Sequence, residues 1–286
     1  MSLPVPILLY HSVAHLTPTR FRKWTIEPAL FAAHMAYLRA QHYTPLTVTQ
    51  LVCALSDHHP GLPARPIVIS FDDGYADFLE AAWPVLKQFE FAATLYVVTK
   101  YVGQSSSWLH GQGAGDRPML TWVQLAELSA AGIECGAHSH THVQLDTVPS
   151  ELAREEIVRS KSELEQHLNR PVETFAYPYG YYSPRERELV QAAGFTSACA
   201  VKHALSTTAD DRFALARIIV TADTDVAHLS QLLTGQHLRL APADEQPWTK
   251  VWRLIRRARW RLISAMGTGL WRKPPGAAIC RDSMES

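Results

Sequence analysis

Residues 66–74 read Pro-Ile-Val-Ile-Ser-Phe-Asp-Asp-Gly, and this stretch decides the class of fold. Its first part is apolar without alternation, which is typical of a strand buried on both faces of a parallel sheet. Asp72 and Asp73 follow directly. Consecutive strand residues point to opposite faces, so the chain must turn to bring both carboxylates into one site, and Gly74 allows that turn. A turn that is merely rich in Asp and Gly is the structural alternative.

Similar apolar runs recur along the chain, separated by helical patterns. The expected strands are residues 6–13, 66–71, 92–98, 133–137, 174–177, 197–201 and 215–220. The expected helices are residues 28–41, 76–89, 121–131, 150–169, 183–193 and 225–233. This alternation predicts a parallel sheet. Because the chain has no Gly-x-Gly-x-x-Gly fingerprint, an α/β barrel is favoured over a doubly wound sheet, with its chemistry at the carboxyl ends of the strands.

Composition excludes several classes of protein. The 286 residues suit one large domain or two small ones, and 47% apolar with 19% charged residues is ordinary for a globular chain. A net charge of +0 gives no overall attraction to nucleic acid. Four cysteines without a Cys-x-x-Cys pair indicate neither a zinc knuckle nor a redox dithiol, whereas fourteen histidines favour metal or acid–base chemistry.

Three of these histidines lie in residues 136–142, Gly-Ala-His-Ser-His-Thr-His, directly after an expected strand. In a helical turn His138 and His142 would lie on one side and could reach one ion. A pair formed by His138 and His140 would instead need extended backbone. Two neutral imidazoles and one carboxylate leave positions on the ion open, as a catalytic site requires. Zn²⁺ is the expected ion, and Co²⁺, Ni²⁺ or Fe²⁺ would suit the same ligands.

Two further clusters follow expected strands. Residues 177–180, Tyr-Pro-Tyr-Gly, would form a rigid aromatic rim for a sugar face, or aim a backbone N–H at an oxyanion; a simple turn is the alternative. His11 ends the first strand, where a structural hydrogen bond is the alternative role. A barrel would place all four clusters on one rim.

Together these clusters resemble the polysaccharide deacetylase family, also called the NodB-homology or carbohydrate esterase 4 family, over roughly residues 6–220. Residues 70–74 match the family's Thr/Ser-Phe-Asp-Asp-Gly motif, and residues 138–142 match its His-Ser/Thr-x-x-His motif. The resemblance implies a distorted (β/α)7 barrel of NodB type, which we expect over residues 1–235. From the composition of the remaining residues, 236–286, we expect a basic C-terminal helical extension.

The resemblance also implies roles for individual residues. Asp72 would be the catalytic base, and the backbone N–H of Tyr179 would hold the oxyanion. The implied metal ligands are Asp73, His138 and His142. The residues assigned to substrate binding are Tyr75, Pro178 and Arg217.

The sequence departs from the common family pattern at two points. Ala176 stands where an Arg usually begins the third motif, and the late Leu-x-His motif is not evident. Both departures resemble the poly-N-acetylglucosamine deacetylase subgroup, which has Tyr-His on the first strand and Phe-Ala-Tyr-Pro-Tyr-Gly at the third motif. By this likeness His11 would be the general acid, and Arg217 would replace the missing Arg beside Asp72. His140 receives no role.

The implied activity is metal-dependent removal of N-acetyl groups from an amino-sugar glycan, in polysaccharide biosynthesis or modification. One alternative is a deacetylase or deformylase of a lipid-linked amino sugar, and another is a non-catalytic carbohydrate-binding relic. A glycosidase would need two carboxylates roughly 5–10 Å apart across the sugar, and it would leave the histidines unexplained.

The C-terminal part has a different character. Residues 242–247 read as a linker, and residues 248–275 hold eight Lys or Arg, no Asp or Glu, and four of the eight tryptophans. One helical face of this tail carries Val251, Ile255, Ala258 and Leu262. This pattern predicts peripheral membrane association; the alternative is a helix packed on the barrel with a solvated basic face. Because the N-terminus lacks a signal-peptide pattern, we expect a cytoplasmic protein, with the inner face of the membrane as its second expected place.

Overall fold

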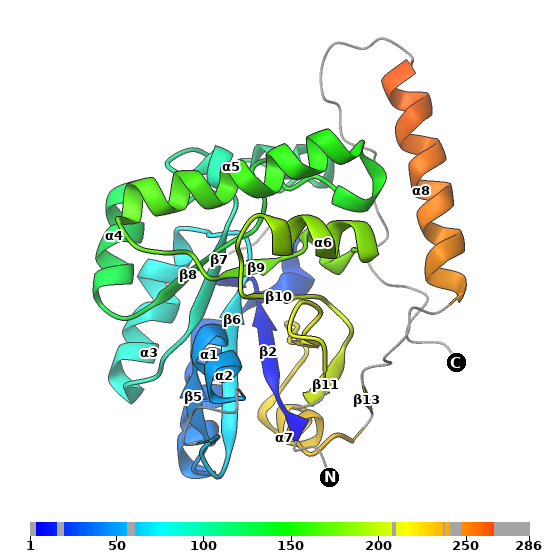
Figure 1. Cartoon of the computed structure of the whole chain (residues 1–286). Helices are drawn as coiled ribbons and strands as arrows, with labels where there is room; N and C mark the ends of the chain where they lie inside the picture. Colours follow the sequence, from blue (N-terminus) through cyan, green and yellow to red (C-terminus); the bar gives the residue numbers. More distant parts are fainter. Residues whose placement is uncertain are drawn as a thin grey trace.

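The computed structural model describes residues 4–15, 20–55, 61–207, 210–236, 238–240 and 247–265. A parallel sheet forms its centre, with the strand order β10-β9-β8-β7-β6-β2-β12 and with β5 also beside β6 (Figure 1). These strands are β2 (Ile7–Tyr10), β5 (Thr44–Leu46), β6 (Pro66–Phe71), β7 (Thr94–Val97), β8 (Glu134–Ala137), β9 (Thr174–Ala176), β10 (Ser197–Cys199) and β12 (Ile218–Ile219).

The two ends of this sheet are joined by one interrupted segment. Leu215 forms a parallel bridge with Cys199 of β10, whereas β12, three residues later, pairs with Leu8 and Leu9 of β2. The sheet therefore curls into a distorted (β/α)7 barrel of NodB type, as the sequence predicts. The expected strand at 215–220 is broken in its middle, and the break places the buried side chain of Arg217 beside Asp72.

Eight α-helices occur in the described residues. They are α1 (Pro28–Ala40), α2 (Val48–Ala54), α3 (Trp83–Phe89), α4 (Trp122–Ala130), α5 (Ser150–Leu168), α6 (Pro184–Ala192), α7 (Val226–Leu233) and α8 (Pro247–Ala265). The helix expected at 76–89 is instead a π-helical segment, Phe78–Ala82, followed by α3. Pro84 has no N–H for an α-helical bond, and the preceding N–H of Trp83 bonds to Phe78, five residues back. Helix α2 was not expected, although Thr47 and Gln50 form its capping box.

Short strands outside the central sheet divide the expected first strand. β1 (Pro4–Val5) pairs with β11 (Ala204–Thr207), which also pairs with β13 (Arg239–Leu240). β3 (Ser12–Val13) pairs with β4 (Thr25–Ile26). The segment predicted at 6–13 is therefore interrupted at His11, which leaves the sheet just where its side chain enters the site.

The core holds the site-bearing strands in place. Every residue of β2 and β6 is buried, because their inner faces fill the barrel and their outer faces meet helices. Tyr10 of β2 packs against Phe31 of α1 and Phe71 of β6, with ring centroids 5.3 Å apart in each case. Burial of each such aromatic or aliphatic side chain contributes about 1.5–3 kcal/mol. Asp72 and His11 therefore follow rigid elements.

The C-terminal extension contains α8, which stands beside the barrel in Figure 1. No helix in the described ranges is both long and apolar enough to cross a bilayer. Residue 237, the linker residues 241–246, the tail beyond residue 265 and Cys280 lie outside the described residues. The domain boundary at residue 235 stays a prediction.

Candidate active site

The four clusters singled out in the sequence meet at one edge of the barrel. Asp72 and Asp73 follow β6, His138 follows β8, Tyr179 follows β9 and His11 follows β2. These side chains share one pocket with a volume of about 100 Å³. Its lining is Leu9, His11, Phe21, Trp24, Asp72, Asp73, Trp108, Leu109, Gln112, His138, His142, Tyr179, Tyr181, Val201 and Ile219. The strand ends thus bring together residues separated by more than half of the chain.

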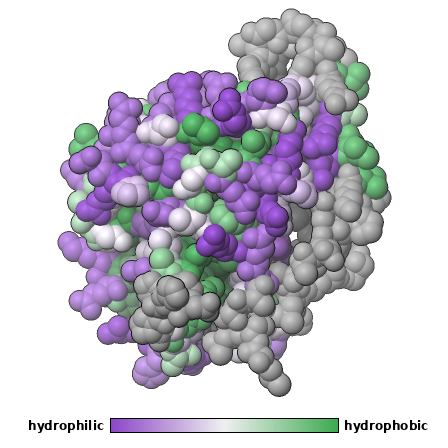
Figure 2. Space-filling view, viewed as in Figure 1, coloured by the Kyte–Doolittle hydropathy of each residue, from purple (hydrophilic) through white to green (hydrophobic). Residues whose placement is uncertain are grey.

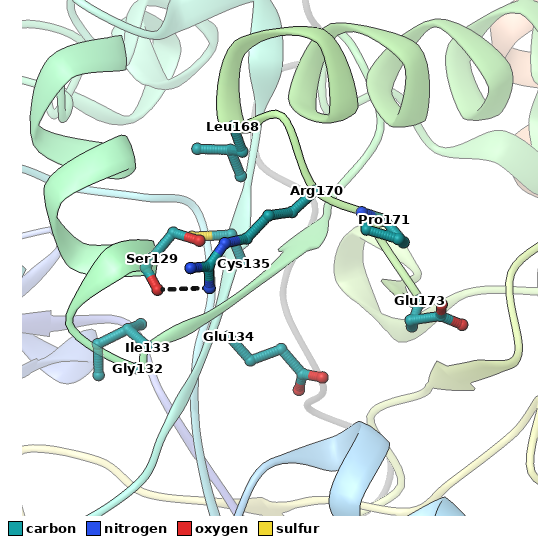
Figure 3. Close-up of a pocket in the computed structure, with 9 residues that line it drawn as sticks. All are labelled: Ser129, Gly132, Ile133, Glu134, Cys135, Leu168, Arg170, Pro171 and Glu173. Atoms are coloured by element: carbon teal, nitrogen blue, oxygen red, sulfur yellow. Dashed lines mark hydrogen bonds between the residues drawn. The ribbon is translucent and has the colours of Figure 1, made fainter.

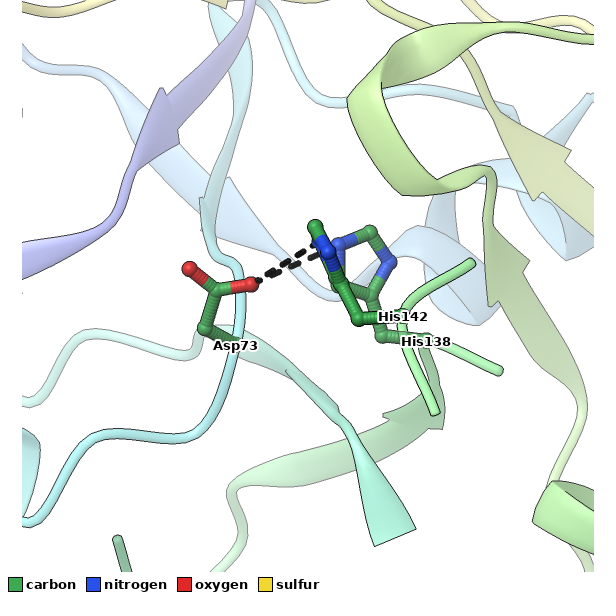
Figure 4. A group of neighbouring side chains, drawn as sticks. All are labelled: Asp73, His138 and His142. Carbon is green, nitrogen blue, oxygen red and sulfur yellow. Dashed lines mark ion pairs between the residues drawn. The ribbon is translucent and has the colours of Figure 1, made fainter. Parts of the chain in front are cut away.

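Asp73, His138 and His142 form a compact group of metal-ligand type (Figure 4). Oδ1 of Asp73 lies 3.7 Å from Nε2 of His138 and 3.3 Å from Nε2 of His142. All three ligand atoms lie within 4.8 Å of one another, and all three residues are buried. The alternative pairing of His138 with His140 is not the one that the structure shows.

Hydrogen bonds and ring contacts orient the two imidazoles. Nδ1 of His138 lies 2.8 Å from the carbonyl oxygen of Ala176, so this nitrogen carries the proton and Nε2 keeps its lone pair for a cation. The backbone N–H of His142 donates to Oγ of Ser139 at 3.0 Å. The His142 ring packs on Tyr179, with centroids 4.6 Å apart.

The donor set fits a divalent ion. Oδ1 of Asp73 accepts no hydrogen bond from the described residues, although it is buried and faces two imidazole nitrogens. A tetrahedral site with ligands at about 2.0–2.1 Å has ligand atoms roughly 3.3 Å apart, close to the separations found here. A cation would neutralise the buried carboxylate and use both imidazole lone pairs. Two imidazoles and one carboxylate leave at least one position for substrate.

Arg217 holds Asp72 apart from this group. Its Nη1 and Nη2 donate to the two carboxylate oxygens of Asp72 at 2.6 and 2.8 Å, and its Nε donates to the carbonyl oxygen of Ala200 at 3.0 Å. Burial acts to raise the pKa of Asp72, but the charges of Arg217 and His138 and the Arg217 hydrogen bonds outweigh it and lower the pKa below its usual range. Asp72 is therefore an ionised carboxylate fixed at the floor of the pocket.

His11 lines the same pocket as the metal-ligand group. Its ring lies against Trp24, with centroids 5.1 Å apart, and its Nδ1 has no hydrogen-bond partner among the described residues. Burial lowers the pKa of His11, and the charges of Asp73 and Asp72 act in the opposite direction. The imidazole can therefore exchange a proton with a group bound in the pocket.

Left-handed backbone conformations concentrate at the site. Asp73, Ser139, His142 and Tyr179 all have φ between 60° and 77°, a region that non-glycine residues rarely adopt. The next residue after Tyr179 is Gly180, also at positive φ, where an added Cβ would lie 2.4 Å from Cβ of Val201. These turns allow ligand side chains from adjacent positions of a loop to face one ion.

Three residues assigned to substrate binding lie outside the pocket lining. Tyr75 is buried against Trp108, with ring centroids 6.3 Å apart, and under the guanidinium of Arg117. Pro178 is also buried, and Arg217 contacts Asp72 as described above. Their contact with substrate stays a prediction, as do the catalytic roles of Asp72, His11 and Tyr179.

His140 points away from the metal-ligand group. Its Nδ1 lies 3.0 Å from Oγ1 of Thr99 and 3.2 Å from a carboxylate oxygen of Glu163. Its backbone N–H bonds to the carbonyl oxygen of Glu156. His140 therefore fixes the histidine loop to α5.

The profile of the family "Polysaccharide deacetylase" matches residues 59–198, which include both aspartates and all three histidines of the loop. This segment, 140 of the 286 residues, belongs to the polysaccharide deacetylase family. The enzyme is accordingly an amide hydrolase of the class that acts on N-acetyl groups. Outside this segment, His11 and Arg217 complete the site from the barrel strands that flank it.

Relatives of this deacetylase extend over most of its length. YxkH of Bacillus subtilis, named for the same family, is 26% identical over 76% of this chain and 71% of its own. The poly-beta-1,6-N-acetyl-D-glucosamine N-deacetylase of Staphylococcus aureus is 22% identical over 76% of this chain and 74% of its own. The fold matches the deacetylase PplD of Streptococcus pyogenes, solved with acetate, with a TM-score of 0.70, 23% identity and coverage of 82% and 99%. It also matches IcaB of Ammonifex degensii, with a TM-score of 0.69, 23% identity and coverage of 80% and 97%.

The aromatic wall of this deacetylase's pocket was missed from the sequence. It comprises Phe21, Trp24, Trp108 and Tyr181, with Leu109 and Gln112 beside them. Trp108 lies in the loop segment Ser107–Gln112 and also contacts His142, with ring centroids 5.4 Å apart. A Trp within a run of Ser, Gly and Gln is the only sequence signal for this wall.

A second cavity, about 180 Å³ in volume, lies at the opposite ends of β8 and β9 (Figure 3). Its lining includes Cys135 and Arg170, and Arg170 donates to the carbonyl oxygen of Ser129 at 3.1 Å. Burial raises the pKa of the Cys135 thiol to about 12, so the thiolate is not available as a nucleophile. This cavity therefore lies at the strand ends opposite the candidate active site and offers no thiolate.

Proposed function

We propose that this chain is a divalent-metal-dependent deacetylase of an N-acetylated amino-sugar glycan related to poly-N-acetylglucosamine. One observation carries the proposal: the Asp73–His138–His142 group lies directly beside Asp72, which Arg217 holds ionised. A site that only bound a metal would not need the second, fixed carboxylate. The S. aureus relative, named for poly-beta-1,6-N-acetyl-D-glucosamine, supports the substrate class.

Asp73, His138 and His142 would hold the ion. When bound, a divalent ion supplies a polarised acetyl carbonyl and a water of lowered pKa. Oδ2 of Asp72 lies 3.7 Å from Nε2 of His138, but both carboxylate oxygens of Asp72 accept hydrogen bonds from Arg217, so Asp72 borders the metal-ligand group without belonging to it. Asp72 takes a proton from the attacking water, and Arg217 keeps its oxygens aimed at that water.

Tyr179 and His11 act on the other parts of the reacting amide. Tyr179 lines the pocket in a left-handed turn, and its backbone N–H would donate to the oxyanion; one such donor is worth about 3 kcal/mol. His11 donates a proton to the departing amine, which leaves poorly without it. The histidine and the aspartate thus act as acid and base in one pocket.

The pocket wall fits a sugar. Phe21, Trp24, Trp108 and Tyr181 line the pocket, and aromatic rings of this kind can pack against the C–H face of a pyranose. The polar Gln112 lies in the same wall and could contact hydroxyl groups. Such a wall selects a carbohydrate over a small unbranched amide.

Acetate release from N-acetylglucosamine oligomers tests the proposal. We expect release with Zn²⁺, Co²⁺ or Ni²⁺ present, loss after exhaustive chelation, and recovery when the ion is returned. The Asp72→Asn variant should bind the metal and release acetate at least about 10²-fold more slowly. Undiminished release from metal-stripped protein would refute metal dependence. Binding of oligomers by wild-type protein without any acetate release would instead indicate a carbohydrate-binding relic.

A lipid-linked amino sugar is the second candidate substrate. It is favoured by one contact: Arg256 of the basic helix α8 lies 3.8 Å over the ring of Tyr181, which lines the pocket. The same acetate assay with a lipid-linked N-acetylated sugar in detergent, compared with a soluble oligomer of equal concentration, separates the two. A formylated analogue in a third arm tests the acyl group.

A further inference from the structure

Helix α8 contacts the barrel through its arginines. Arg256 donates to both carboxylate oxygens of Asp146 at 2.7 and 2.6 Å, and Arg257 donates to the Asp146 carbonyl oxygen at 2.7 Å. Arg253 donates to the carbonyl oxygen of Tyr182 at 3.2 Å. The side chain of Asp146 is almost completely buried beneath these contacts. The inner face of this helix therefore combines these three arginines with Trp260, which is partly buried against the hydrophobic core.

The opposite face of α8 is apolar and exposed. Its exposed fractions are 43% for Val251, 63% for Leu254, 49% for Ile255 and 60% for Leu262. At 100° per residue these four side chains fall within an arc of about 100°, which is a continuous stripe. They are four of the six large hydrophobic side chains exposed among the described residues. Figure 2 shows hydrophobic surface at the right-hand edge, where α8 stands in Figure 1.

This polarity is the reverse of what the packed-helix alternative assumed, which was a basic face in solvent. A helix that only covered the barrel would turn its apolar stripe inward and its arginines to solvent. Here ion pairs with Asp146 hold the basic face inward, and the stripe is presented outward. Leaving such a stripe in water is unfavourable, so the arrangement suits an occupant that covers it.

We propose that the outward face of α8, carrying Val251, Leu254, Ile255 and Leu262, binds the interface of an anionic lipid membrane. Residues 247–265 contain six Lys or Arg and no acid, while the whole chain has a net charge of +0. The rest of the chain therefore carries −6, so positive charge is concentrated on this helix. Arg253, Arg256 and Arg257 face the barrel, whereas Arg259 is exposed beside the stripe. This complementarity favours anionic lipid. A second copy would instead bring two positive helices together.

The binding face is coupled to the active site by contact. Arg256 spans from Asp146 to the ring of Tyr181, and Tyr181 lines the catalytic pocket. A membrane covering α8 would lie beside the pocket wall. The inference concerns binding alone, so it does not depend on the proposed substrate.

Vesicle co-sedimentation of the full chain tests the inference. We expect binding to phosphatidylcholine vesicles that contain phosphatidylglycerol, and much weaker binding to phosphatidylcholine alone or at high salt. Leu254→Ser combined with Leu262→Ser should lower the partition coefficient at least about tenfold, because two apolar side chains no longer enter the interface. The matched control is Val123→Ser, which changes an apolar residue on α4 that is 68% exposed.

Each result bears on the proposal. Acetate release from a soluble oligomer and the circular dichroism spectrum should match wild type in both variants, since none of these residues contacts the pocket. Absence of binding to anionic vesicles, or equal binding by wild type and the double variant, would overturn the inference. So would a wild-type dimer in sedimentation velocity that the double variant loses, because that result assigns the stripe to an interface between copies.

Discussion

Arg217 and Asp72 form a buried, bidentate ion pair that joins a break in one barrel strand to the end of another. The two hydrogen bonds measure 2.6 and 2.8 Å, and the Arg217 side chain is completely buried. The pair keeps the pKa of Asp72 below its usual range against the opposing effect of burial. Asp72 therefore stays ionised to a lower pH than an ordinary aspartate.

Replacing Arg217 with Gln should move the acid limb of the pH–activity profile to higher pH. Without the guanidinium, burial dominates and the pKa of Asp72 rises, so the base is ionised only at higher pH. We expect an activity loss of roughly 10²-fold at neutral pH that shrinks as the pH rises. The measurement is kcat/KM against pH.

The control for this variant is Arg217→Lys, which retains a charge and should shift the limb less. Because removing one partner of a buried pair costs about 3–5 kcal/mol, thermal unfolding must show that the variant is folded under assay conditions. An acid limb identical to that of wild type would contradict the assigned partnership.

Metal binding should depend on His142 and not on His140, although the two lie two residues apart. His142 Nε2 lies 3.3 Å from Asp73, whereas His140 contacts Thr99 and Glu163. With ligand at 100 times its dissociation constant, binding adds about 2.7 kcal/mol to the free energy of unfolding. Added Zn²⁺ should therefore raise the melting temperature of wild type and His140→Ala, but not of His142→Ala. An equal rise in all three proteins would place the ion elsewhere.

His11→Gln should lower turnover far more than substrate affinity. His11 lines the pocket, and its proposed role is to protonate the leaving amine. General acid catalysis contributes typically about 10²–10⁴-fold, so kcat should fall by that factor while KM changes little. The alkaline limb of the kcat profile should also disappear, because it reports loss of the acid's proton. A large rise in KM with unchanged kcat would assign His11 to binding.

Sequence patterns predicted the site better than they predicted its surroundings. Apolar runs followed by Asp72, His138 and His11 could be interpreted because buried parallel strands share one functional edge. The aromatic wall could not be predicted, because Trp24 and Trp108 come from separate segments that are brought together only by the tertiary structure. The sequence pattern also could not predict which face of α8 turns toward the barrel. Amphipathicity predicts which residues share a face, but the ion pairs with Asp146 decide which face turns inward.

Because of His34, which lies outside the pocket, the free energy of unfolding should fall in mild acid. Nε2 of His34 donates to the carbonyl oxygen of Thr224 at 2.9 Å, and Nδ1 accepts from the hydroxyl of Tyr10 at 3.0 Å, so the folded protein holds a neutral imidazole. Burial lowers its pKa from the ordinary value of 6.5. Below 6.5 the unfolded chain therefore binds a proton that the folded chain excludes, and the free energy of unfolding falls as the pH falls, by up to about 1.4 kcal/mol per pH unit from this group.

His34→Gln isolates this contribution, since glutamine can donate to Thr224 and accept from Tyr10 without titrating. Urea unfolding between pH 7.5 and pH 5 would measure it, over a window in which ordinary carboxylates stay ionised. We expect the variant to be less stable than wild type at pH 7.5, because the replacement packs less well, and to lose less stability on acidification. Equal slopes in wild type and His34→Gln would show that His34 is not the group that binds the proton on unfolding.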